Sequence, residues 1–153
     1  MNVKLPTLAT VALVALVLSG CTTVSTEPSP REFADKFTTA ETKAWSTGNI
    51  DDLKALEDDA VVYHLPGMDL KGWKAHEDYI VKGRETIKDL KQSWKYLSGE
   101  GNHIVLDYGA TAVMKGDGQK PDQRVSVSYL FVMRLKDKKV AEVWANGSTT
   151  TTP

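Results

Sequence analysis

The spacing of apolar residues changes along this chain from about 3.6 positions to two, and this change limits the folds open to it. In the first part, Phe33, Phe37 and Ala40 recur at helical spacing. From residue 90 to 96, and again from 124 to 135, apolar and polar residues alternate as in strands with one buried face. Helices followed by strands on short turns predict an α+β domain. A bent antiparallel sheet wrapped around the helices, in the shape of a cone, would bury this one-sided apolar surface.

Capping and turn residues place the boundaries of these elements. Ser29, Pro30 and Glu32 form a capping-box pattern, and Gly48 suits the left-handed residue that ends a helix. The predicted helices cover residues 30–47, 50–56 and 73–89. The predicted strands cover residues 60–65, 90–97, 103–108, 110–115, 124–135 and 140–145.

The first twenty-one residues have the pattern of a secretory signal. One basic residue, Lys4, precedes an apolar run that continues to Leu18, and Leu18-Ser19-Gly20-Cys21 ends the segment. This ending resembles a bacterial lipobox, which implies that Cys21 is acylated after cleavage and anchors the chain in a membrane. An ordinary cleaved signal with a chance cysteine is the alternative. Thr22 after the cysteine implies the outer membrane, facing the periplasm, in an organism with two membranes.

Composition supports one domain behind a short tether. We predict a signal peptide over residues 1–20, a flexible tether over 21–29, a folded domain over 30–146 and a disordered tail over 147–153. Without Lys4 the 133 remaining residues (153 − 20) carry 18 basic and 20 acidic side chains. This balance gives no electrostatic basis for binding nucleic acid. A single cysteine excludes an internal disulfide.

Several local phrases of the sequence resemble the SnoaL-like, ketosteroid-isomerase-like branch of the nuclear transport factor 2-like proteins. The matching segments are residues 45–53, 59–64, 66–67, 70–72, 108–113 and 137–144. The resemblance implies a cone-shaped barrel with a pocket at its open end, and pairing of two copies through the outer sheet. Members include isomerases, cyclases, dehydratases and binding modules, so the fold leaves the function open.

His64 is the candidate catalytic residue. It ends the first predicted strand, where the resembled isomerases hold their aspartate base, and an imidazole with a pKa near 6.5 can act as a base at neutral pH. The alternative is a histidine that bonds a loop or lines the pocket. The other isomerase groups do not carry over, because Glu41 stands where a tyrosine is needed and Leu130 or Phe131 where a carboxylic acid is needed.

Aromatic residues are the candidate ligand contacts. The chain has four tryptophans, and an aromatic-lined pocket suits an apolar or ring-shaped ligand. Core packing is the alternative for each ring. The candidate ligand-binding residues are Trp45, Tyr63, His64, Trp73, Tyr79 and Tyr129.

No metal or cofactor is expected. The three histidines are far apart in sequence, and neither a nucleophile elbow nor a phosphate-binding glycine loop is present. Two functions stay open: a module that binds a small apolar or aromatic ligand or a partner protein, and an isomerase, cyclase or dehydratase with His64 as its base.

Overall fold

The computed structural model describes residues 28–116 and 121–152, and every structural statement below concerns these residues. The helices are α1 (Pro30–Thr47), α2 (Asp51–Leu56) and α3 (Trp73–Thr86). The strands are β1 (Glu57–Leu65), β2 (Met68–Lys71), β3 (Ile87–Glu100), β4 (His103–Met114), β5 (Gln123–Lys136) and β6 (Lys139–Thr152). Within the described ranges, no helix is both long enough and apolar enough to cross a membrane.

The six strands form one sheet in the order β2-β1-β6-β5-β4-β3. All neighbouring strands are antiparallel except β1 and β6, which run parallel. The predicted α+β class is therefore confirmed, while the sheet is mixed rather than wholly antiparallel. After β1 the chain passes through β2, α3 and the antiparallel strands β3, β4 and β5 before β6 returns to lie beside β1. The pairing of β1 with β6 is therefore not a hairpin, and the two strands run parallel.

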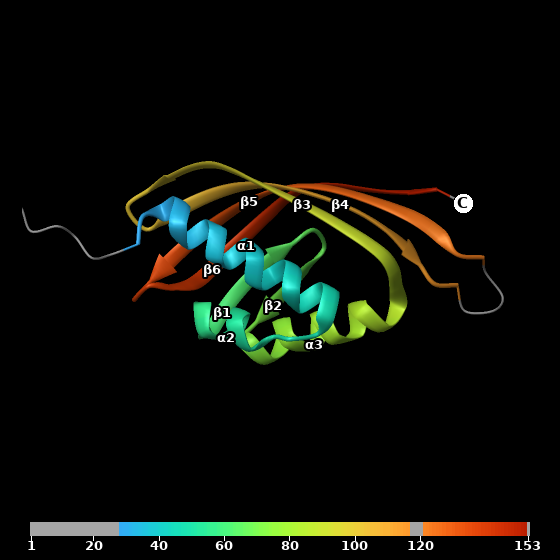
Figure 1. Ribbon diagram of the computed structural model, residues 1–153, viewed down its shortest axis with the longest axis horizontal. Coiled ribbons are helices and arrows are strands. Elements are labelled where there is room, and N and C mark those ends of the chain that lie inside the picture. Colours follow the sequence, from blue (N-terminus) through green and yellow to red (C-terminus); the bar gives the residue numbers. More distant parts are fainter. Residues whose placement is uncertain (1–27, 117–120, 153) are drawn as a thin grey trace, which may run out of the picture.

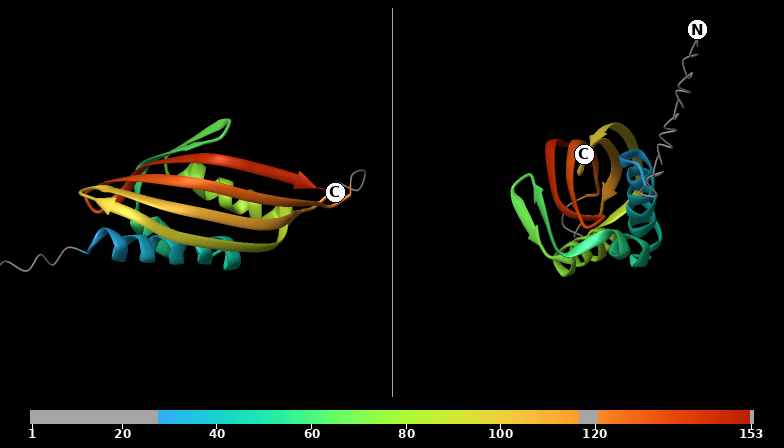
Figure 2. Two further views of the ribbon diagram at one scale, coloured as in Figure 1. Left: turned by 90° about the horizontal axis from the view of Figure 1, so that it is seen from above. Right: turned by 90° about the vertical axis from the view of Figure 1, so that its left-hand side faces the viewer.

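The sheet is strongly curved and does not close (Figure 2). All three helices lie on its concave side, with α1 running beneath the long strands and α3 across the open side (Figure 1). The core fills the space between them, and its members are wholly or nearly buried. They include Phe37, Leu53, Val61, Ile80, Ile104, Leu106, Met133 and Val143. Every core residue lies between Phe33 and Ala145, so a chain that starts at residue 22 keeps the complete domain.

Both predicted ends of α1 are confirmed. The Ser29 hydroxyl accepts from the Glu32 N–H at 3.2 Å, and the Glu32 carboxylate accepts from the Ser29 N–H at 2.7 Å. Gly48 closes the helix with φ 83°, a left-handed conformation that glycine adopts without a steric penalty. The helix thus ends where the sequence predicted, and the chain turns towards α2.

Several predicted elements need correction, and β1 at Glu57 and β3 at Ile87 each begin three residues earlier than predicted. β2 was not predicted, because its four residues after Pro66-Gly67 are too few to show an alternating pattern. β4 is one strand, since Gly109 pairs with Ser93 and Ser128 on its two sides without a break. α3 ends at Thr86 rather than at residue 89, because the backbone turns into β3 there.

The predicted tail is also different in the structure. Residues 147–152 continue β6 and pair with residues 124–129 of β5, so the domain extends beyond Asn146. The prediction of a disordered tail rested on the low-complexity, threonine-rich composition of this segment. Threonine nevertheless favours strands, and the long β5 offers it a complete row of backbone partners.

Candidate functional site: an aromatic chamber with a polar inner pocket

Two adjoining cavities lie between the concave face of the sheet and the helices. We call the larger one, of about 480 Å³, the aromatic chamber. The smaller one, of about 130 Å³, is the inner pocket. The two share four lining residues, Trp45, Tyr79, Tyr108 and Tyr129. One ligand could therefore extend from the chamber into the inner pocket.

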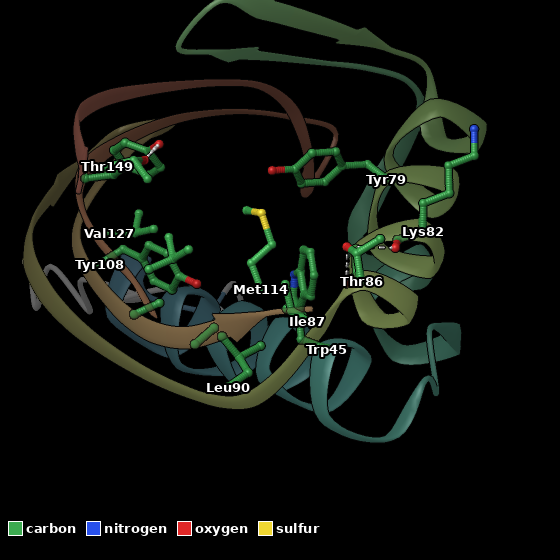
Figure 3. Close-up of a pocket in the computed structure, with 15 residues that line it drawn as sticks. Trp45, Tyr79, Lys82, Thr86, Ile87, Leu90, Tyr108, Met114, Val127 and Thr149 are labelled. Atoms are coloured by element: carbon green, nitrogen blue, oxygen red, sulfur yellow. Dashed lines mark hydrogen bonds between the residues drawn. The ribbon is translucent and has the colours of Figure 1, made fainter. Parts of the chain in front are cut away.

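The chamber is lined mainly by aromatic and aliphatic side chains from α3 and the long strands. Figure 3 shows the Tyr79 ring and the Met114 side chain directed into the cavity, while the amino group of Lys82 points away from it. Trp45 meets Tyr79 edge-to-face, with ring centroids 5.9 Å apart. Strand alternation explains the wall, because Ala110, Ala112, Val125 and Val127 occupy the inward positions of β4 and β5; they line it with Ile87 and Leu90.

Glu41 is the acidic group of the inner pocket. It is 8% exposed, its Oε1 accepts a hydrogen bond from Trp45 Nε1 at 3.0 Å, and its Oε2 has no partner. Burial raises the pKa of Glu41, and the charge of Glu57 raises it further. The positive charge of His76 and the Trp45 bond lower it only in part. One carboxyl oxygen is therefore fixed while the other is available to a ligand.

A second carboxylate, Glu57, orients the histidine of the pocket. Glu57 is 1% exposed; its Oε1 accepts from the Tyr63 hydroxyl, and its Oε2 lies 3.1 Å from His76 Nδ1. Because an ionised carboxylate can only accept, Nδ1 carries the proton in this bond. Burial alone would lower the pKa of His76, but the bond to Glu57 and the charges of Glu57 and Glu41 outweigh it, so the pKa is raised. Nε2 then points towards Glu41, whose Oε1 is 4.0 Å away.

Glu41, Glu57 and His76 are also the residues that could hold a metal, since one ligand atom from each lies within 4.8 Å of the others in the described part of the chain. Their hydrogen bonds compete with that role. Both oxygens of Glu57 and the Nδ1 of His76 already have protein partners. This leaves one free ligand atom each on Glu41 and His76, which is fewer than a tight site needs.

His64 lies on the other face of β1 from the pocket. Successive strand residues point to opposite faces, so Tyr63 faces the inner pocket and His64 faces outwards. There His64 bonds Asp69 at 3.0 Å and Glu142 at 3.1 Å, and it stacks on Trp144. These bonds raise the pKa of His64, the one to Glu142 most. The structure thus separates this predicted catalytic residue from both cavities.

The other candidate ligand contacts divide in two. Trp45, Tyr63, Tyr79 and Tyr129 all line the inner pocket. Trp73 does not line either cavity; it is 7% exposed and its ring meets the edge of His76, so it packs behind the site as part of the core.

Sequence reasoning missed Glu41, Glu57 and His76 as site residues. A signal was present, because Glu41 lies next to Ala40 on the apolar stripe of α1 and His76 lies between Trp73 and Ile80 on that of α3. Ionisable residues on a buried stripe need partners, and partners for such groups gather in one place. Glu57 gave no such signal, since it stands at the junction of α2 and β1.

The curved sheet around three helices, with a cavity inside, defines the class of the molecule as a nuclear transport factor 2-like fold. Solved structures agree. An NTF2-like protein from Exiguobacterium sp. 255-15 has a TM-score of 0.62 and 16% identity, over 76% of this chain and 98% of that one. An LEH-like epoxide hydrolase from M. tuberculosis has a TM-score of 0.60 and 13% identity, over 76% and 83%. TsrD from Streptomyces laurentii has a TM-score of 0.64 and 18% identity, over 82% and 91%.

The family is more specific than the fold. The sequence model of the SnoaL-like domain matches residues 39–143, which is most of the chain. The protein therefore belongs to the SnoaL-like domain family. Curated proteins give no match. The identities to the solved structures are low, so these structures establish the fold and leave the activity to the site itself.

Proposed function

We propose that this protein is a membrane-anchored envelope lipoprotein whose SnoaL-like domain binds a small apolar or aromatic ligand. The aromatic chamber carries the binding part of the proposal. Its volume of about 480 Å³ lies in the range of small-molecule sites, roughly 300–1,000 Å³, and its wall is mainly apolar. The four aromatic residues shared with the inner pocket supply flat surfaces for a ring-shaped ligand.

The anchoring part rests on the sequence. Cys21 and the segment before it lie outside the described residues. The lipobox-like ending, the single cysteine and the start of α1 at Pro30 support a lipid anchor with a short tether. Acyl chains hold a protein at a membrane because each buried methylene contributes about 0.8 kcal/mol.

Binding is tested by thermal shift on the soluble form, residues 22–153, with a panel of small aromatic and alicyclic compounds. We expect a saturable rise in Tm, because a ligand that binds only the folded state stabilises it. Ala112→Phe fills the chamber and should abolish the shift. Thr111→Phe places the same ring at an exposed position next to it and should not. A panel without hits, or hits that survive Ala112→Phe, would contradict the proposal.

A proton-transfer enzyme of the isomerase, cyclase or dehydratase kind is the second candidate. One observation favours it: Glu57 orients His76 through Nδ1, as a carboxylate orients a catalytic base. The base in this version is His76, since His64 faces away from the cavities.

Any compound that shifts Tm can test this candidate. It is incubated with the protein in D₂O, and NMR follows deuterium uptake or product formation. The wild type and His64→Asn should show the same exchange rate, while His76→Asn should lose it. Exchange that is unchanged in His76→Asn, or absent from the wild type, would end the enzyme candidate.

A further inference from the structure

We infer that the inner pocket is a recognition site for the hydroxyl group of a small aromatic alcohol, held between the carboxylate of Glu41 and the imidazole of His76. This inference rests on the proposed ligand binding and adds the chemical class of the ligand. The ring system of the ligand occupies the aromatic chamber, since the inner pocket, at about 130 Å³, takes only the polar end.

The unpartnered polar atoms of the fold point to this pocket. In residues 28–116 and 121–152, two buried side-chain atoms have no hydrogen-bond partner, Glu41 Oε2 and Trp94 Nε1. Both residues line the inner pocket. Proteins satisfy nearly all buried polar groups, because an unmet one costs about 1–3 kcal/mol. Two unmet groups on one small cavity indicate a polar atom that arrives with a ligand.

The spacing of Glu41 and His76 fits one bridging oxygen. Nε2 of His76 is 4.0 Å from Oε1 of Glu41, too far for a direct hydrogen bond. An oxygen atom about 2.8 Å from both Nε2 and Oε1 spans this gap, because Oε1 keeps a second lone pair beside the one that accepts from Trp45. The neighbouring groups hold both in place, Trp45 on the carboxylate of Glu41 and Glu57 on the imidazole.

A hydroxyl is the group that satisfies both partners. A hydroxyl carries one donor and two acceptor lone pairs, so a single hydroxyl can bond His76 Nε2 and the carboxyl group of Glu41 at the same time. A carboxylate ligand would add a further negative charge beside Glu41 and Glu57. No Lys or Arg of the described chain lines the inner pocket to neutralise that charge.

The test compares two ligands of nearly the same shape, 2-naphthol and 2-methylnaphthalene, by titration calorimetry on the soluble form at neutral pH. A site that bonds a substrate hydroxyl rejects the analogue without it, because its own polar groups are then left unpaired. We expect 2-naphthol to bind at least tenfold more tightly to the wild type.

Three variants locate the preference for the hydroxyl. In Glu41→Leu it should fall to within about twofold, and in Glu41→Gln, which keeps an acceptor oxygen, it should be retained in part. His76→Leu should reduce it independently, so the inference can be tested even where one variant fails to fold; Tm confirms folding in each case.

The outcomes separate the two proposals. Equal affinity of the two ligands for the wild type, or a preference that persists in both Glu41→Leu and His76→Leu, overturns the hydroxyl site and leaves the proposed ligand binding intact. Failure of both ligands to bind, together with an empty thermal-shift panel, overturns the ligand binding itself and the inference with it.

Discussion

Glu57 shows how a single buried charge can be accommodated. Its two oxygens accept from Tyr63 and His76, so a carboxylate with 1% exposure keeps partners on both sides. Burial and the nearby charge of Glu57 raise the pKa of Tyr63 well above its usual value, so the phenol stays a donor. The carboxylate thus fixes both the tautomer and the direction of the histidine.

Replacement of Glu57 should be strongly destabilising. Glu57→Leu leaves the Tyr63 hydroxyl and His76 without their acceptor, and removal of one partner from a buried charge pair costs about 3–5 kcal/mol. Tyr63→Phe removes one hydrogen bond only and should cost about 1.5–3 kcal/mol. Urea unfolding measures both. A Glu57→Leu cost no larger than that of Tyr63→Phe would contradict the central role of this carboxylate.

His64 predicts a pH-dependent contribution to stability. Its pKa is raised in the folded protein from 6.5 by Glu142 and Asp69, so the contribution is complete below pH 6.5 and is lost as pH rises through the folded pKa. The side chain is 35% exposed, and such pairs contribute less than about 1 kcal/mol. The stability difference between wild type and His64→Asn should therefore shrink above pH 6.5. Urea unfolding from pH 5 to 9 measures the free energy of unfolding of both proteins. A difference between them that grows with pH would contradict this assignment.

At the scale of elements, α3 is placed by contacts to the end of α1. Arg84 Nε donates to the Trp45 carbonyl at 2.9 Å, and Gly83 lets the Trp45 ring approach the helix backbone. Gly83 lies inside α3, where a glycine costs about 1 kcal/mol relative to alanine. The structure explains it, because the ring that shapes both cavities needs the missing side chain.

Gly83→Ala should therefore not give the usual gain from a better helix former. The added methyl would lie 2.6 Å from two atoms of the Trp45 indole, so the ring must move. Replacing glycine by alanine inside a helix normally adds about 1 kcal/mol of stability. We expect this gain to be absent, and we expect the affinity for the ligand to fall at least tenfold. Glu85→Ala, an exposed position on the same helix, serves as the control and should leave affinity unchanged. A stabilised variant with normal affinity would contradict this account of Gly83.

The last part of β6 belongs to the domain and to the site. Thr149 pairs with Val127, lines the chamber and hydrogen-bonds the Tyr129 hydroxyl at 2.7 Å. A chain that ends at Asn146 should lose at least about 2 kcal/mol, because the backbone groups of β5 lose their partners. Thr149→Val keeps the strand but removes the hydroxyl, and should cost about 1 kcal/mol. Thermal unfolding compares the two variants with the wild type. An unchanged Tm in the shortened chain would support the prediction that residues 147–153 are a disordered tail.

At the scale of the whole molecule, the proposed anchor and the domain are separable. We expect mass spectrometry of the protein purified from membranes to find acyl chains on an N-terminal Cys21. Cys21→Ser should prevent acylation of the chain. The Tm of the folded domain should stay the same, since every core residue lies after the predicted tether. An unmodified thiol at residue 21, or an intact signal segment on the mature protein, would contradict the anchor.

The sequence by itself determined the α+β class, the caps of α1 and the inward face of β5. These are local properties: a capping box needs four consecutive residues, and alternation shows on one strand. The same alternation could have separated Tyr63 from His64, but only the sheet decides which face is covered. Residues such as Trp45 and Tyr129 could be named as aromatic candidates because ring chemistry is visible without a fold.

Only the tertiary structure decided where the polar end of the site lies. Glu41, Glu57 and His76 come from α1, β1 and α3, separated by 16 and 19 positions in the chain. No local pattern relates them, because their meeting depends on how two helices cross beneath a curved sheet. Long-range packing also paired the threonine-rich end with β5. Composition indicates which conformations a segment favours, whereas its tertiary contacts determine which conformation it adopts.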